Sequence, residues 1–153
     1  MNPSISVIIT TFNNEKYLRG AIQSVLRQTY KPYEVIVVDD GSKDNTRSII
    51  TEFDGKIRYL FQENRGPSAA RNLGIGEAKC EFIAFLDADD VWDENKLQLQ
   101  LEQICNSDTV GLVTCDRKEL LPDGKTQIKK IDVNIKDMNS FLKNFTMKNY
   151  LEI

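Results

Sequence analysis

The sequence predicts an α/β fold with a mostly parallel sheet and helices on both faces. Residues 5–10 (ISVIIT) and 33–40 (YEVIVVDD) are runs of β-branched residues with little polar alternation, as in strands that are buried on both faces. The stretches between such runs carry apolar residues at helical spacing. Strands and helices therefore alternate along the chain, which is the pattern of a parallel sheet.

The first two strands are each followed by a predicted helix. After residues 5–10, the apolar residues from Leu18 to Leu26 recur at the spacing of an amphipathic helix. The second strand ends on Asp39, Asp40 and Gly41. A second helix follows over residues 46–53, with Asp44 or Asn45 as its expected cap.

A third and a fourth strand are predicted at residues 57–61 (IRYLF) and 82–89 (FIAFLDAD). Between them, Gly66 and Pro67 mark the start of a helix, because proline is tolerated in the first helical turn. The small residues that follow Pro67 allow this helix to approach the sheet closely.

The last third of the chain predicts further elements. Asp93 can cap a helix that carries apolar residues from Leu97 to Cys105. Residues 110–116 (VGLVTCD) predict a fifth strand, and a turn at residues 121–125 (LPDGK) leads into an extended segment. A last helix is expected over residues 137–145.

Bulk composition excludes several classes of protein. The chain has 153 residues, about one domain. Its net charge of −3 argues against a partner held by bulk positive charge, so we expect no nucleic-acid binding. No apolar run approaches the ~20 residues of a transmembrane helix, and the N-terminus lacks the pattern of a signal peptide. We expect a cytoplasmic protein whose association with the inner face of the membrane, if any, is peripheral.

The absence of histidine limits the chemistry further. It excludes Ser-His-Asp and Cys-His catalysis as well as histidine-ligated metals. Three widely spaced cysteines form no C-x-x-C pair, so we expect buried thiols. Any metal must be held by carboxylates, which favours Mg²⁺ or Mn²⁺.

Polar residues follow the predicted strands where each of them ends. Thr10 ends the first strand, Asp40 ends the second, and Asp87 and Asp89 end the fourth. Because ligands of parallel sheets bind outside the carboxyl ends of the strands, we expect these side chains to meet at one edge. Three carboxylates within residues 87–90 also require a positive partner. Arg71, on the third helix, is the best candidate.

This edge suits a nucleotide that is bridged to the protein by a metal ion. The Asp40 carboxylate only accepts hydrogen bonds, so it can read the N3–H of uracil or thymine or the donors of guanine, and it repels the bare N3 of cytosine. Asp87 and Asp89 can hold a divalent ion that also coordinates a diphosphate. Both clusters could instead cap the helices that follow them. Phe12 could stack on a base or fill the core. Trp92 could form the floor of a sugar pocket or anchor the core. Arg65 could supply positive charge to the phosphates or the base, or be a solvated loop residue, which we favour.

Three stretches carry a resemblance to a known family: SVIITTFNNEKYLRGAIQSVLRQTYKPYEVIVVDDGSKDNT, NRGPSAARNLGI and FIAFLDADD. In this order and at this spacing they resemble family 2 glycosyltransferases of the GT-A fold, over roughly residues 4–101. The resemblance implies a nucleotide-diphosphate-sugar donor, UDP- or dTDP-linked, Mg²⁺ or Mn²⁺, and transfer with inversion. It also implies a saccharide or lipid-linked saccharide acceptor, in cell-surface polysaccharide synthesis.

The resemblance also assigns roles to particular residues. Thr10 and Phe12 match positions that hold the base, Asp40 matches the carboxylate that reads uracil, and Arg71 matches an arginine near the nucleotide. Within the D-x-D motif, Asp87 matches the position near the ribose and phosphates. Asp89 matches the direct metal ligand, and Asp87 and Asp90 are further possible ligands.

The chain departs from the family pattern after residue 116. The family carries its general base in a Glu-Asp pair well beyond the D-x-D motif, and residues 117–153 contain no such pair. We expect residues 1–116 to form the donor-binding core and residues 117–153 to begin a truncated acceptor-side region, with the base beyond Ile153. Such a chain binds the sugar nucleotide and transfers poorly.

Two alternatives to a glycosyltransferase stay open, and a third is excluded. A non-catalytic nucleotide-sugar-binding module is consistent with the missing base. A phosphoacceptor receiver domain would share the acidic strand ends, but it needs a lysine after a late strand, where this chain has Asp116. A dinucleotide-dependent oxidoreductase would need G-x-G-x-x-G after the first strand, where the chain reads TTFNNE.

Overall fold

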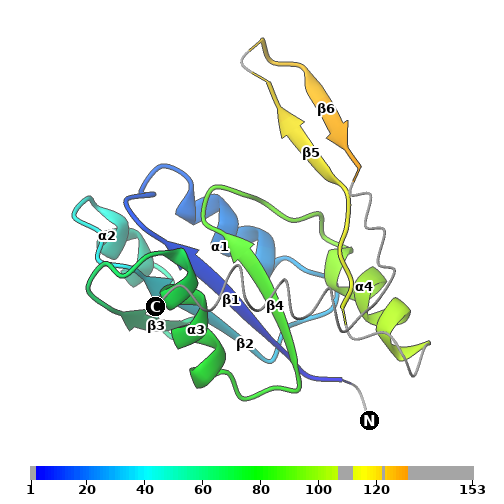
Figure 1. The fold of residues 1–153 in the computed structure, drawn as a ribbon, viewed down its shortest axis with the longest axis horizontal. Helices are drawn as coiled ribbons and strands as arrows, with labels where there is room; N and C mark the ends of the chain where they lie inside the picture. Colours follow the sequence, from blue (N-terminus) through cyan, green and yellow to red (C-terminus); the bar gives the residue numbers. More distant parts are fainter. Residues whose placement is uncertain (1–2, 107–111, 122, 131–153) are drawn as a thin grey trace. The chain divides into compact units, whose positions relative to one another are not determined.

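A computed structural model describes residues 3–106, 112–121 and 123–130 (Figure 1). The chain forms two compact units, Met1–Gln98 and Leu99–Ile153. The first contains a four-stranded parallel sheet in the order β3-β2-β1-β4, with β1 between β2 and β4 (Figure 1). Its elements are β1 (Ile5–Thr11), α1 (Leu18–Leu26), β2 (Glu34–Asp39), α2 (Thr46–Thr51), β3 (Arg58–Phe61), α3 (Pro67–Glu77) and β4 (Phe82–Asp87). These elements confirm the predicted fold class.

The sheet is covered by helices on both faces. Ile8 on β1 and Ile36 and Val38 on β2 pack with Ala70 of α3 in one buried cluster. Because side chains alternate along a strand, the fully buried Val7 and Ile9 point to the opposite face, where α1 contacts β1. The predicted burial of the first two strands on both faces is therefore confirmed.

The helix α3 begins as predicted, with Gly66 before its first turn and Pro67 in it. It lies very close to β1. A Cβ atom at Gly74 would stand only 2.6 Å from Cγ2 of Ile8, so no larger residue fits there without a shift. The close approach fixes the distance between the sheet and the helix that carries Arg71.

The second unit differs from the prediction. Residues 112–116 of the predicted fifth strand contain no strand. The strand instead lies later, at β5 (Arg117–Leu120), and pairs antiparallel with β6 (Thr126–Lys129). The predicted turn explains the shift: Gly124 has a φ of +79° and brings the residues on either side of it into register. The predicted helix over residues 137–145 lies outside the described residues.

The helix α4 (Lys96–Cys105) is present where a helix was predicted. None of the helices in the described part of the chain is long and apolar enough to cross a membrane. The expectation of buried thiols is wrong, because Cys105 and Cys115 are exposed and Cys80 is half-buried. The boundary expected after residue 116 falls within the second unit, and the division into donor and acceptor sides stays a prediction.

Candidate functional site

The register of the sheet aligns the polar ends of its strands. Thr10 on β1 lies beside Asp87 on β4, and Thr11 lies beside Asp39 on β2. Backbone hydrogen bonds extend this alignment past the strands, from the Asp40 N–H to the Thr11 carbonyl (2.9 Å) and from the Ala88 N–H to the Thr10 carbonyl (3.2 Å). Segments that are distant in sequence therefore end at one edge.

A cavity of about 460 Å³ lies at this edge, within the first unit. It is lined by six residues that the sequence singled out: Thr10, Phe12, Asp40, Arg71, Asp87 and Asp89. Asp90 is not among the lining residues. The structure thus brings the predicted side chains together around one space.

Asp40 is buried and holds the loop that precedes α3. Its Oδ1 accepts hydrogen bonds from the Gln62 side chain (2.6 Å) and the Arg65 N–H (2.9 Å), and its Oδ2 accepts one from the Gly66 N–H (2.9 Å). Three donors offset the desolvation of this carboxylate. Asp40 therefore joins β2 to the start of α3 and also faces the cavity.

The neighbouring carboxylate of Asp39 is buried and points the other way. It accepts hydrogen bonds from the Ser42 N–H (2.9 Å) and the Tyr59 hydroxyl (3.2 Å). Burial of the phenol, together with the nearby Asp39 charge, raises the pKa of Tyr59. Asp39 is thus part of the packing beneath the turn and does not line the cavity.

A glycine makes the turn after Asp40 possible. Gly41 has a φ of +82°, which side-chain-bearing residues rarely adopt. A Cβ atom there would stand 2.8 Å from the backbone nitrogen of Asn64. The turn and the 62–66 loop are therefore in close contact, which brings the loop within reach of Asp40.

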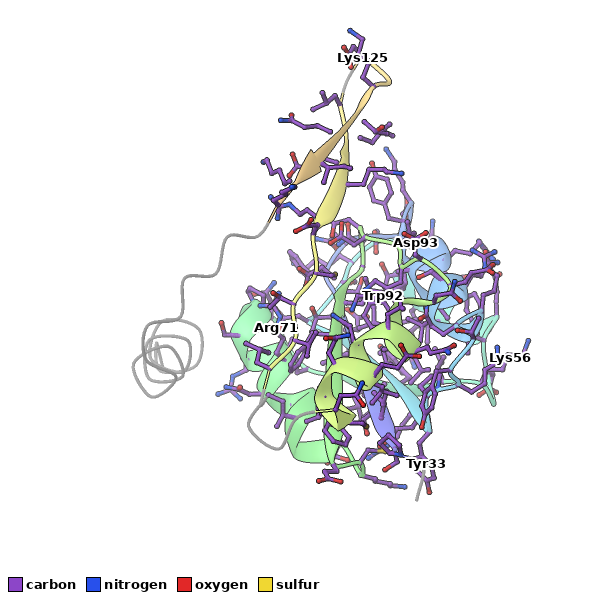
Figure 2. The ribbon with its side chains drawn as sticks, turned by 90° about the vertical axis from the view of Figure 1, so that its right-hand side faces the viewer. Tyr33, Lys56, Arg71, Trp92, Asp93 and Lys125 are labelled. Atoms are coloured by element: carbon purple, nitrogen blue, oxygen red, sulfur yellow. The ribbon has the colours of Figure 1, made fainter. Side chains whose placement is uncertain are left out.

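Arg71 supplies the positive charge that the acidic cluster requires. Its guanidinium donates to Oδ1 of Asp87 at 2.7 Å, and the Thr10 hydroxyl lies 3.4 Å from the same oxygen. Figure 2 shows the Arg71 side chain on α3. Because Arg71 is only about one-quarter exposed, its charge faces a partly desolvated cavity wall. A guanidinium has five donors, so others remain for a ligand.

The acidic side chains can share a divalent cation. Oδ1 of Asp87 faces Arg71 and Thr10, so its Oδ2 could face a cation. Asp89 is exposed and accepts no hydrogen bond from the described residues. Within those residues, no group of three or more acidic or cysteine side chains is placed to hold a metal by itself. The oxygen donors therefore fit an ion such as Mg²⁺ or Mn²⁺ that takes its remaining ligands from phosphates and water.

Two loops beside the cavity are joined by reciprocal hydrogen bonds. The Glu15 N–H donates to Oδ2 of Asp44 (3.0 Å), and the Asn45 N–H donates to the Glu15 carboxylate (2.7 Å). Asn13, at a φ of +51°, accepts from the Lys43 N–H (2.8 Å). Partial burial acts to raise the pKa of Asp44, but hydrogen bonds from Thr46 and Glu15 outweigh it and lower the pKa. These bonds hold the loop that carries Phe12.

Of the remaining candidate residues, Phe12 lines the cavity, whereas Trp92 and Arg65 do not. The Phe12 ring is 43% exposed and lines the cavity, so it is no core plug. Trp92 is half-buried, with the Lys96 ammonium 4.2 Å from its ring centre, and lies outside the cavity lining in the segment after β4 (Figure 2). Arg65 is exposed and contributes its backbone N–H to Asp40.

Several lining residues were not predicted from the sequence to belong to the site, namely Asn14, Asn64, Gly66 and Pro67. Thr11 also lines the cavity, and its buried hydroxyl has no hydrogen-bond partner among the described residues. One signal could have found them: each lies in a segment that follows the carboxyl end of a strand, where ligands of parallel sheets bind.

Comparison with known proteins assigns the family. The sequence model described as "Glycosyl transferase family 2" matches residues 6–151. The chain belongs to this family. The resemblance seen in its motifs is thereby confirmed, and the receiver and oxidoreductase alternatives are set aside.

Individual relatives of this glycosyltransferase chain support the same family assignment. It is 48% identical to an uncharacterized glycosyltransferase of Nostoc sp. over 71% of this chain and 35% of the relative. It is 43% identical to the Escherichia coli UDP-Glc:α-D-GlcNAc-diphosphoundecaprenol β-1,3-glucosyltransferase WfgD, over 65% of this chain and 40% of that enzyme. The chain spans less than half the length of both relatives.

A solved structure shows the same fold. The mannosyltransferase PcManGT from Pyrobaculum calidifontis, in complex with GDP-Man and Mn²⁺, is 28% identical with a TM-score of 0.66. The similarity covers 75% of this chain and 36% of that one. The glycosyltransferase chain therefore has the GT-A fold that its motifs implied.

Proposed function

We propose that this chain is the donor-binding part of a metal-dependent, inverting glycosyltransferase that uses a nucleotide-diphosphate-sugar. The observation that carries the proposal is the gathering of Asp40, Arg71, Asp87 and Asp89, from separate segments, around one cavity. Family membership supports the reaction class. The geometry supports a division of the site into a base end and a phosphate end.

At the base end, Asp40 favours uracil or thymine. Each carboxylate oxygen offers about two lone-pair sites. Two donors occupy Oδ1 and one occupies Oδ2, so Oδ2 keeps one site that no donor among the described residues fills. Uracil and thymine present the single N3–H that this site can take. Guanine presents adjacent N1–H and N2–H donors and needs two acceptors. Thr10 and Phe12 would contact the same nucleotide, with the Phe12 ring available for stacking.

At the phosphate end, Arg71 and the two carboxylates act together. The Arg71 guanidinium, oriented by Asp87, would donate to a phosphate oxygen. Asp89 would be the main ligand of the divalent cation, with Asp87 as a second one. The cation would neutralise charge on the departing diphosphate. We place no general base among the described residues: Glu119 is paired with Lys129 and Arg117, and Asp123 with Lys125.

The acceptor is proposed to be a saccharide or a lipid-linked saccharide in cell-surface polysaccharide synthesis. The name of the Escherichia coli relative supports this, because its acceptor is attached to diphosphoundecaprenol. An acceptor of that kind lies at a membrane surface, and nucleotide sugars are cytoplasmic metabolites. We therefore propose that the protein works in the cytoplasm, peripheral to the inner face of the membrane.

Nucleotide selectivity tests the proposal. Isothermal titration of the chain with UDP, dTDP and GDP, each in the presence of Mn²⁺, compares bases that differ in their donors. We expect UDP or dTDP to bind at least about tenfold more tightly than GDP, a difference of about 1.4 kcal/mol. Equal or tighter binding of GDP would contradict the role of Asp40. A failure of all three nucleotides to bind would contradict the proposed donor site.

A further inference from the structure

The segment that follows Asp89 is fastened to the end of α1 by a buried amide side chain. Gln28, just beyond α1, is completely buried. Its Nε2 donates to the Asp93 carbonyl (2.7 Å) and to the Ser24 carbonyl (3.2 Å). Its Oε1 accepts from the Leu97 N–H (3.0 Å). One side chain thus bonds both ends of the 93–97 turn.

Two neighbours of Gln28 hold the same segment. The Ser24 hydroxyl accepts from the Trp92 N–H (3.1 Å) and donates to the Ala21 carbonyl (2.8 Å). The Thr29 N–H donates to the Glu94 carbonyl (2.8 Å). We call Ser24, Gln28 and Thr29 the α1 latch. Together they bond four residues of the segment: Trp92, Asp93, Glu94 and Leu97.

The latch lies close in sequence to the acidic cluster. On one side of Asp89, the Ala88 N–H is bonded to the Thr10 carbonyl, at the end of the sheet. On the other side, the latch begins at Trp92. The carboxylate of Asp89 itself accepts no hydrogen bond from the described residues. The place of this carboxylate therefore depends on a short backbone stretch that is fixed at both ends.

A buried glutamine is costly at a position that an apolar side chain would fill. Removing an amide from water costs free energy unless its donors and acceptor are bonded, and Gln28 satisfies both groups with backbone partners. It does not line the cavity, so a direct contact with a bound nucleotide is excluded for it in this structure. Its bonds act on the segment between the metal-binding motif and α4.

We propose that Gln28 is a positioning residue for the cation site: through the α1 latch it holds Asp89 where the carboxylate can share a divalent cation with a bound diphosphate. This inference rests on the proposed function. It assigns a role in metal binding to a residue that contacts neither the cavity nor the D-x-D motif. Groups that hydrogen-bond directly to a metal ligand commonly change metal affinity by 10–100-fold when they are replaced. Gln28 acts one step further away, through the backbone, so we expect an effect at the lower end of this range.

The test measures how strongly Mn²⁺ promotes UDP binding. The quantity is the metal effect, defined as the Kd of UDP without metal divided by its Kd with Mn²⁺, from isothermal titration. Gln28→Leu keeps a similar volume and removes the three hydrogen bonds. We expect it to reduce the metal effect by roughly tenfold and to leave the metal-free Kd of UDP nearly unchanged. Ser24→Ala, which removes one bond to the segment, should give a smaller reduction and serves if Gln28→Leu does not fold.

Ser6→Ala is the matched control. The Ser6 hydroxyl is also buried and bridges distant segments, donating to Glu34 (2.7 Å) and accepting from the Cys80 N–H (3.2 Å), away from the cavity. This variant should lower thermal stability and keep the full metal effect. If Ser6→Ala reduces the metal effect as much as Gln28→Leu, or if both latch variants keep it, the positioning role is overturned. If the wild-type chain shows no metal effect at all, the proposed function fails first and the role of Gln28 fails with it.

Discussion

Replacing Asp40 by asparagine tests the double role of this carboxylate. The native group accepts three hydrogen bonds from Gln62, Arg65 and Gly66. An asparagine has one acceptor oxygen, which can keep the two bonds at the Oδ1 position. Its amide group must then face the Gly66 N–H, donor against donor. The variant therefore loses one charge-assisted bond, worth about 1.5–3 kcal/mol, and leaves the partly buried Gly66 N–H facing another donor.

We expect Asp40→Asn to lower the free energy of unfolding by about 3 kcal/mol in urea denaturation. UDP binding should weaken as well, because the remaining acceptor at Oδ2 is replaced by a donor. Asp54→Asn is the control, since Asp54 is exposed and accepts a single bond from the Gly55 N–H. It should change stability by no more than about 0.5 kcal/mol. A loss below about 1 kcal/mol for Asp40→Asn would refute the role of Asp40 in holding the loop before α3.

Further predictions concern the loops around the cavity. The folded-state pKa of Asp44 lies below its usual value of 3.8, so its carboxylate adds stability above about pH 3.8 and loses that contribution as the pH falls further. The difference in unfolding free energy between the wild type and Asp44→Asn should therefore shrink as the pH falls below 3.8. Denaturation between pH 3 and 6 measures this difference, and a constant difference would contradict the prediction. Gly41→Ala should cost more than Gly55→Ala in urea denaturation. Both glycines have positive φ, which costs about 1–2 kcal/mol with a side chain, but only Gly41 meets another backbone, at Asn64. Equal losses of unfolding free energy in the two variants would argue against the contact between Gly41 and Asn64.

Much of the fold follows from sequence patterns because the first unit consists of a sheet between layers of helices, and each layer has its own apolar spacing. Residues 7–9 and 35–38 are apolar at successive positions, as expected of a strand that is buried on both faces. Because ligands of parallel sheets bind outside the carboxyl ends of the strands, the sequence alone predicts that Thr10, Asp40, Asp87 and Asp89 lie at one edge. The order of elements carried that information, since parallel strands must end on the same side.

The features of the site that the sequence did not predict depend on contacts between segments that are distant in sequence. The three donors to Asp40 come from the 62–66 loop. No local sequence pattern predicts that this loop lies beside the end of β2. Gln28 lies within the first stretch that resembles the family, but no role was assigned to it from the sequence. Its importance appears only from its hydrogen bonds to residues 93 and 97. The strand predicted at residues 110–116 is absent from its described part, residues 112–116, for a related reason. An apolar run forms a strand only where a partner is available, and the turn around Gly124 supplied a partner to Arg117–Leu120 instead.

The most direct test of the account is the effect of Mn²⁺ on UDP binding in Asp89→Asn, with Asp90→Asn as its neighbour control. The central claim is that the carboxylate of Asp89 shares a divalent cation with the diphosphate. The account predicts that Mn²⁺ strengthens UDP binding by the wild type and by Asp90→Asn, whereas Asp89→Asn loses this gain and keeps the metal-free affinity. A full Mn²⁺ gain in Asp89→Asn would contradict the claim.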